Sequence, residues 1–149
     1  MKRFVNFLVV VLAVTAIRGA FPALAGAQQA VPFKGSAELT LTNSTKDMTG
    51  VLTLTYDGTG QGTHLGRFTE HAILVVQVDG SFMANVTLTA ANGDQVFKSA
   101  VGTNVSAGIF TINGGTGRFM NASGKGVVLH ASSDGFVHVA QTYDGTIQF

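Results

Sequence analysis

The sequence predicts an all-β domain that folds as a single small closed antiparallel barrel of about eight strands. After Pro32 the 149-residue chain contains no proline, and glycine is abundant. Thr, Val and Phe recur between turn signals, and no segment beyond the N-terminal one has apolar residues at helical spacing. Eight antiparallel strands would use almost all of the chain, and closing the sheet would remove its exposed edges.

The clearest strand is 81–91, in which apolar side chains alternate with polar ones. Its expected core face carries Phe82, Ala84, Val86, Leu88 and Ala90. Pairs that tolerate tight hairpins fall between the strands, at Asp57-Gly58, Asp79-Gly80, Asn92-Gly93 and Asp134-Gly135. The expected strands are 33–42, 49–56, 63–77, 81–91, 94–101, 105–112, 117–131 and 136–149.

The N-terminal segment has the pattern of a cleavable signal peptide. Lys2 and Arg3 precede an apolar run that ends before Arg18, which is too short for a membrane-spanning helix. Small residues allow cleavage after Ala25 or Ala27. We therefore expect residues 1–27 to be a signal peptide, residues 28–149 to form one β-barrel domain, and the protein to be secreted or periplasmic.

Composition excludes several classes of function. Without residues 1–27, six Lys and Arg remain against eight Asp and Glu, so the mature chain is slightly acidic and charge-poor. Such a surface is a poor partner for nucleic acid, and we expect no binding to it. The chain has no cysteine, which excludes disulfides, thiol nucleophiles and cysteine-ligated zinc.

The stretch NGGTGRFMNASGKGVV, residues 113–128, contains five glycines and raises the question of a phosphate-binding loop. A Walker-type loop that ends at Gly124-Lys125 would need glycine at Phe119, and a dinucleotide fingerprint from Gly115 would need glycine at Met120. Both motifs fail, and no helix follows. The glycines are instead expected to let strands bend and approach one another closely, and no cofactor is expected.

The same stretch carries a resemblance. Gly114 to Phe119, followed by Ala122 and Gly124, resembles the GGTG-x-F-x-x-A-x-G element of the allene oxide cyclase and dirigent barrels. The segments THLGRFT at 63–69, ANGD at 91–94 and DGTI at 144–147 resemble an exported bacterial branch of that superfamily. The resemblance covers about residues 33–149 and implies an allene oxide cyclase-like, calycin-like barrel. It carries over no catalytic residue, because the cavity residues of neither group match this chain one by one.

The segment THLGRFTEH, residues 63–71, holds the densest set of polar residues. His64, Arg67 and Glu70 are the candidate catalytic residues, weighed against structural hydrogen bonding at a barrel rim. On one strand His64 and Glu70 would be about 20 Å apart, so they cannot form a dyad by themselves. Most aspartates precede or follow glycine and are expected to serve turns.

His130 and His138 are the candidate metal ligands. They flank Ser132 to Gly135, and a three-residue loop there would place them opposite each other on the outer face of a hairpin. Leu129, Ala131, Val137 and Val139 would then form its core face. Two histidines do not complete a zinc site, so a solvent-facing pair without metal is the simpler expectation.

Three functions follow from these observations. The first is a non-catalytic exported barrel that binds a small apolar ligand in its mouth. The second, implied by the resemblance, is an isomerase or cyclase of the allene oxide cyclase type. The third is a small outer-membrane barrel, suggested by alternating Tyr143, Ile147 and the terminal Phe149 but opposed by scarce aromatic girdle residues, so no stable membrane insertion is expected. The resembled family also suggests a homo-oligomer.

Overall fold

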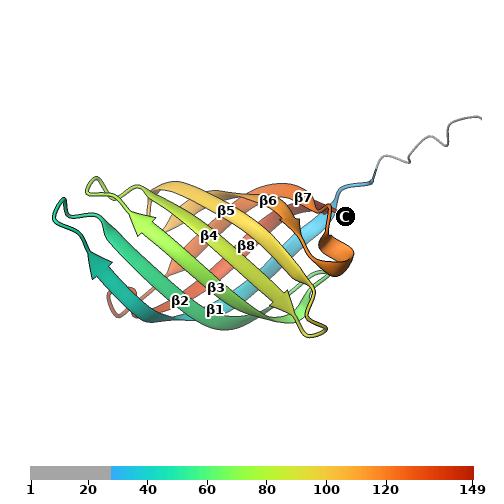
Figure 1. The fold of residues 1–149 in the computed structure, drawn as a ribbon, viewed down its shortest axis with the longest axis horizontal. Coiled ribbons are helices and arrows are strands. Elements are labelled where there is room, and N and C mark those ends of the chain that lie inside the picture. The colour runs from blue at the N-terminus through green and yellow to red at the C-terminus, as the bar shows by residue number, and fades with distance from the viewer. Residues whose placement is uncertain (1–27) are drawn as a thin grey trace, which may run out of the picture.

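The computed structural model describes residues 28–149, so the signal-peptide prediction for residues 1–27 lies outside the described part. The strands are β1 (Val31–Lys46), β2 (Leu52–Gly62), β3 (Gly66–Val76), β4 (Phe82–Ala90), β5 (Gln95–Asn104), β6 (Ala107–Gly115), β7 (Ser123–Ala131) and β8 (His138–Gln148). Each pairs antiparallel with its neighbours in sequence, and β1 pairs with β8 to close the barrel (Figure 1). The predicted fold class is confirmed. Within the described residues, no helix is both long and apolar enough to span a bilayer.

Alternation along the strands separates the interior from the outer wall. On β4 the predicted core residues are all buried, whereas Met83 and Asn85 between them are exposed. The interior is a single apolar cluster to which all eight strands contribute. The outward residues of β1, β2 and β3 are mostly polar or charged.

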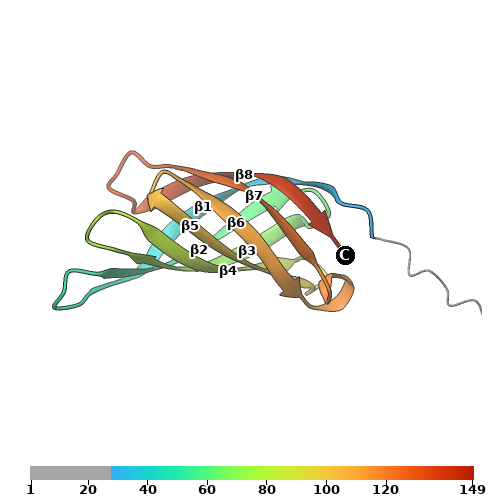
Figure 2. The same cartoon turned by 90° about the horizontal axis from the view of Figure 1, so that it is seen from above.

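The two ends of the barrel differ in what covers them. The start of β1 and the end of β8 lie at one end of the barrel, and the 3₁₀ turn η1 (Gly117–Phe119) lies at the same end, as Figures 1 and 2 show. We call this the closed end. The β1–β2, β3–β4, β5–β6 and β7–β8 connections lie at the opposite, loop end.

The glycine-rich stretch serves shape, as predicted. A Cβ on Gly126 of β7 would lie 2.6 Å from the Phe110 ring, so glycine is needed where β7 passes this ring in the core. The predicted strand 117–131 is wrong at its start, because Gly117, with φ of 56°, begins η1. β7 therefore starts only at Ser123.

Two aspartate–glycine pairs are not turns. Asp57 and Gly58 lie inside β2, where Asp57 accepts from His71 across the strand pair at 2.7 Å. Asp144 lies in β8 and binds Lys34 at 2.8 Å. Local sequence favours a turn at Asp-Gly, but pairing with strands on both sides is decisive here.

The core face predicted for β7 is also wrong. Val128 is buried and His130 half-buried, whereas Leu129 and Ala131 point outward. Of the other two residues predicted for this face, Val139 of β8 points inward as expected, but Val137, which precedes β8, is exposed. The side-chain period of two makes every such assignment depend on register, and apolar residues on both faces of β7 leave the register ambiguous in the sequence.

Candidate functional site

An apolar cavity of about 510 Å³ opens inside the barrel at the loop end. Its wall combines medium-sized aliphatic side chains with small residues on neighbouring strands. The apolar lining includes Leu39, Leu41, Leu52, Leu54, Ala72, Leu74, Val76, Ala84, Val86, Ala100, Val128 and Val139. A volume of this size is in the range of pockets that hold one small molecule.

Two of the three buried charged or amide residues of the described chain, Lys98 and Gln141, line this cavity, and the third, Glu70, contacts both of them from outside the lining. Glu70, Lys98 and Gln141 are 2%, 3% and 4% exposed, and they come from β3, β5 and β8. The Gln141 amide donates from Nε2 to both Glu70 oxygens at 3.0 Å. The Lys98 ammonium lies 3.8 Å from Glu70 Oε1. We call these three residues the floor cluster.

Lys98 lies in a mixed environment. Its Nζ lies 4.8 Å from the centre of the Tyr143 ring and 5.8 Å from that of Phe110, both cation–π distances. Burial lowers the pKa of Lys98, and the nearby Glu70 carboxylate opposes that shift. The distance from Nζ to Glu70 exceeds that of a direct hydrogen bond, and an ammonium has three donors, so Glu70 does not fill the hydrogen-bonding capacity of Lys98, a residue of the cavity lining.

Tyr143 is held by packing and not by a hydrogen bond. Its hydroxyl is buried without a hydrogen-bond partner and lies where Gly35 and Gly62 have no side chain. Burial and the Glu70 charge raise the pKa of Tyr143. The phenol is therefore held neutral between two glycines, next to the floor cluster.

His130 links the floor cluster to the loop end. Its Nδ1–H donates to the Val105 carbonyl at 3.0 Å, and its Nε2 lies 3.1 Å from Gln141 Oε1. The ring edge also packs against Phe82, with 6.0 Å between ring centres. A chain of polar contacts thus runs from Glu70 through Gln141 to His130.

The β7–β8 connection forms part of the mouth. Gly135 and Phe136 are both left-handed, with φ of 72° and 69°, a conformation that costs a phenylalanine energy. The Tyr56 hydroxyl, from the cavity wall, donates to the Phe136 carbonyl at 2.8 Å. This bond helps to hold the strained residue, whose side chain lines the cavity.

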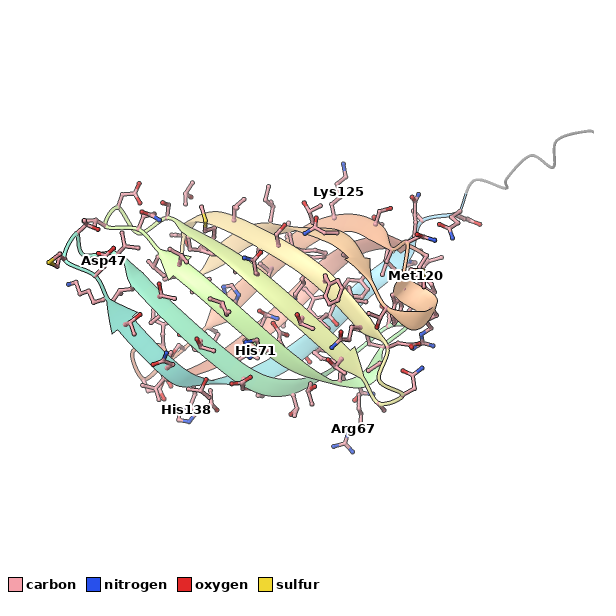
Figure 3. All side chains as sticks on the ribbon, in the orientation of Figure 1. Asp47, Arg67, His71, Met120, Lys125 and His138 are labelled. Atoms are coloured by element: carbon pink, nitrogen blue, oxygen red, sulfur yellow. The ribbon has the colours of Figure 1, made fainter. Side chains whose placement is uncertain are left out.

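The sequence candidates do not assemble into one site. Of the three catalytic candidates, Glu70 is buried against Lys98 and Gln141, which line the cavity, but it is not itself part of the lining. His64 lies in the β2–β3 turn with φ of 63°, and its ring packs against Phe149 at the closed end. Arg67 is exposed and points away from the barrel, next to an open depression of the outer wall (Figure 3).

The two metal candidates are separated. His130 pairs with Gln141, whereas His138 pairs with Thr40 of β1, so the predicted opposition is wrong. His138 points outward and binds Asp134 at 2.6 Å (Figure 3). In residues 28–149 no three His, Asp or Glu side chains gather in a way that could hold a metal ion.

Sequence reasoning missed Lys98 and Gln141, although a signal was present. Lys98 lies between Val96 and Ala100 on the inward positions of β5, and Gln141 lies between Val139 and Tyr143 on β8. A polar residue that interrupts an apolar face at a period of two marks a buried polar group. Only the correct register identifies that face as the inner one.

Comparison with known proteins supports the fold alone. The structure matches the pterocarpan synthase dirigent protein GePTS1 with a TM-score of 0.57 and 15% sequence identity, over 81% of this chain and 86% of that chain. The chain thus has a dirigent-like β-barrel fold, as the sequence resemblance indicated. No model of a protein family matches the sequence. No curated protein matches it either.

Proposed function

We propose that this protein is an exported, non-catalytic barrel that binds one small apolar ligand in the cavity at its loop end. The observation that carries the proposal is the pairing of an apolar wall with a buried ammonium at the floor. A cavity lined in this way, with few polar groups at one place, is the usual form of a small-molecule site.

The floor cluster sets the orientation of the ligand. A buried ammonium with unfilled hydrogen-bonding capacity is costly, and a ligand oxygen beside Lys98 Nζ would relieve that cost. Most of the remaining wall is apolar. The ligand is therefore apolar along its body and carries one oxygen acceptor at the end that enters first.

Displacement of a fluorescent dye tests this function. A neutral apolar dye such as Nile red should gain fluorescence with the purified protein and be displaced by small apolar carbonyl compounds and alcohols. Ala100→Leu should abolish the signal, because Ala100 lines the cavity two residues from Lys98 on the same face of β5. Ala91→Leu, at an exposed position, is the matched control. An unchanged signal in Ala100→Leu would contradict the proposal.

One observation favours the alternative of an isomerase or cyclase. Lys98 lines the end of the apolar cavity and the Glu70 carboxylate lies 3.8 Å from its amine, so the two groups could exchange a proton beside a bound substrate. Such an enzyme would gain most of its rate by holding the substrate near its reacting shape. Incubation with a library of unsaturated fatty acids and terpenoids separates the two functions, since product formation supports the enzyme and binding without product supports the carrier.

Export and freedom from the membrane remain part of the proposal. The apolar interior and the polar outer positions of β1 to β3 are the reverse of the pattern in membrane-spanning barrels, which have a lipid-facing apolar band around a polar interior. We expect the protein in the periplasm or the medium. Detergent-free fractionation tests this, and recovery only in membranes would favour the outer-membrane alternative.

The outer wall supports the expectation of a homo-oligomer. Met83, Val101, Ile109 and Val127 are exposed and pair laterally across β4, β5, β6 and β7. This row is apolar, unlike the polar wall of β1 to β3. A second copy of the chain could cover it. Val101→Lys should then shift the protein to a smaller species in sedimentation, and an unchanged sedimentation profile would count against this surface.

A further inference from the structure

We propose that Lys98 holds its ligand covalently, as an imine between its Nζ and the carbonyl carbon of an apolar aldehyde or ketone. The inference rests on the proposed ligand-binding function and names the class of ligand. It is carried by the position of a single amine at the floor of an apolar cavity, beside a carboxylate.

Lys98 differs from every other lysine of residues 28–149. Lys34, Lys46 and Lys125 are exposed, whereas Lys98 is 3% exposed and lines the cavity. An amine in an apolar enclosure is a nucleophile, because burial lowers its pKa and a larger fraction is neutral at neutral pH. The same enclosure limits the water that would hydrolyse an imine.

Glu70 completes the proton balance of the reaction. The Lys98 ammonium gives one proton to the carboxylate, and the neutral Nζ attacks the carbonyl carbon. A C–N bond forms while the C=O π bond opens, and the oxygen takes a proton from the attacking nitrogen to become a hydroxyl. The C–O bond then breaks, and the hydroxyl leaves as water with the proton returned by Glu70. The product is a protonated imine and one water, so charge is conserved and nothing is oxidised or reduced.

The floor cluster favours a carbonyl over a carboxylic acid. An ionised acid placed at Lys98 would also approach Glu70, whose oxygen lies 3.8 Å from Nζ, and the two negative charges would repel. A protonated imine keeps the positive nitrogen where the ammonium was. It therefore retains the contacts with Glu70 and with the Tyr143 ring while the ligand fills the apolar space.

Trapping with borohydride tests the inference. The purified protein is mixed with 4-(dimethylamino)benzaldehyde, reduced with sodium borohydride, digested and mapped by mass spectrometry. We expect the secondary amine at Lys98 to be in clear excess over that at Lys125, because Lys98 lines the apolar cavity that admits the aldehyde and Lys125 is exposed to water. Before reduction, the protonated imine should absorb at longer wavelength than the free aldehyde. The corresponding benzyl alcohol, which has the same shape, should produce neither signal.

Variants separate capture from folding. Lys98→Met alone leaves Glu70 buried without its cation, so the companion Lys98→Met with Glu70→Gln removes both charges and keeps the shape. Both should lose the adduct. Ala100→Leu retains the amine but fills the space before it, and should also lose the adduct. Glu70→Gln alone should shift the absorption band toward that of the neutral imine, which a purely structural Glu70 would not do.

The outcomes for the two proposals are distinct. If Nile red binds and is displaced but Lys98 carries no more adduct than Lys125, covalent capture is overturned and the carrier function stands. If neither the dye nor the aldehyde enters the cavity, the proposed function itself fails. Preferential reduction at Lys98 that disappears in Ala100→Leu supports both proposals.

Discussion

At the closed end of the barrel aromatic rings meet one another, whereas at the loop end aliphatic side chains border empty space. The Phe119 ring lies 5.0 Å from that of Phe149, and Phe33 lies 5.0 Å from Tyr143. The inward positions toward the loop end include Ala72, Ala84 and Ala100, which line the cavity. Both ends have the same alternating strands, so the filling of the closed end comes from its aromatic side chains and from η1, which brings Phe119 into it.

This difference shows how a small barrel can be stable and still hold a ligand. Tight packing at one end supplies the buried apolar area that a chain without disulfides needs. Smaller side chains at the other end leave a cavity of about 510 Å³ above the floor cluster. The floor cluster lies between the two regions and contains the buried charged and amide side chains of the described chain.

Truncation of a side chain should give the largest difference in unfolding free energy between the two ends. Phe119→Ala removes a side chain with no exposed surface and should cost about 3–5 kcal/mol of unfolding free energy. Leu54→Ala, in the half-buried cavity wall, should cost roughly 1 kcal/mol, because that side chain already borders space. Urea denaturation measures both. Equal losses would mean that the loop end is as tightly packed as the closed end.

Enlargement should have the opposite pattern. Ala122→Leu at the closed end should cost about 1–3 kcal/mol through overpacking, because Ala122 is buried among filled positions. Ala100→Leu should leave the melting temperature almost unchanged, since the added atoms enter the cavity. Thermal unfolding of the two variants compares them directly. A severe loss of stability in Ala100→Leu would show that the cavity cannot be filled from this side.

Removal of the hydroxyl should lower the unfolding free energy for Tyr56 but not for Tyr143. Tyr56→Phe removes the bond to the Phe136 carbonyl at the loop end and should destabilise by about 1 kcal/mol. Tyr143→Phe removes a buried hydroxyl that has no partner, so it should be neutral or slightly stabilising. Chemical denaturation tests the pair. A clear loss in Tyr143→Phe would reveal a hydrogen bond that the structure does not contain.

Acid should loosen the loop end first. Hydrogen bonds from the His138 backbone and side chain lower the pKa of Asp134 from 3.8 to about 2. The folded value lies below the unfolded one, so this contribution is present above pH 3.8 and is lost as pH falls toward 2. Amide NMR signals of residues 132–138 should broaden in that range before those of η1. Asp134→Asn should remove the pH dependence, and simultaneous broadening of η1 would contradict the distinction.

The sequence predicted the architecture well because strand alternation and turn chemistry are local. All eight strands, the inward face of β4 and the turns at Asp79-Gly80 and Asn92-Gly93 follow from short-range pattern. The errors at Asp57-Gly58 and on β7 come from places where the local pattern is compatible with two arrangements. Only pairing with neighbouring strands resolves them.

The candidate site was predictable only in part. Glu70 could be singled out because few carboxylates lie away from turn signals. Its partners Lys98 and Gln141 lie 28 and 71 residues away and meet it only because β3, β5 and β8 enclose the same interior. Arg67 and His64 are near Glu70 in sequence, yet Arg67 faces outward on β3 and His64 lies in the turn before β3, at the closed end.

An even number of strands brings the C-terminus back beside the start of β1, and both lie at the closed end. A handle fused to the C-terminus at Phe149 therefore attaches to the face opposite the mouth. A protein immobilised on a bead or sensor chip through such a handle would present its cavity to the solution. Ligand screening can thus use tethered material without obstructing entry.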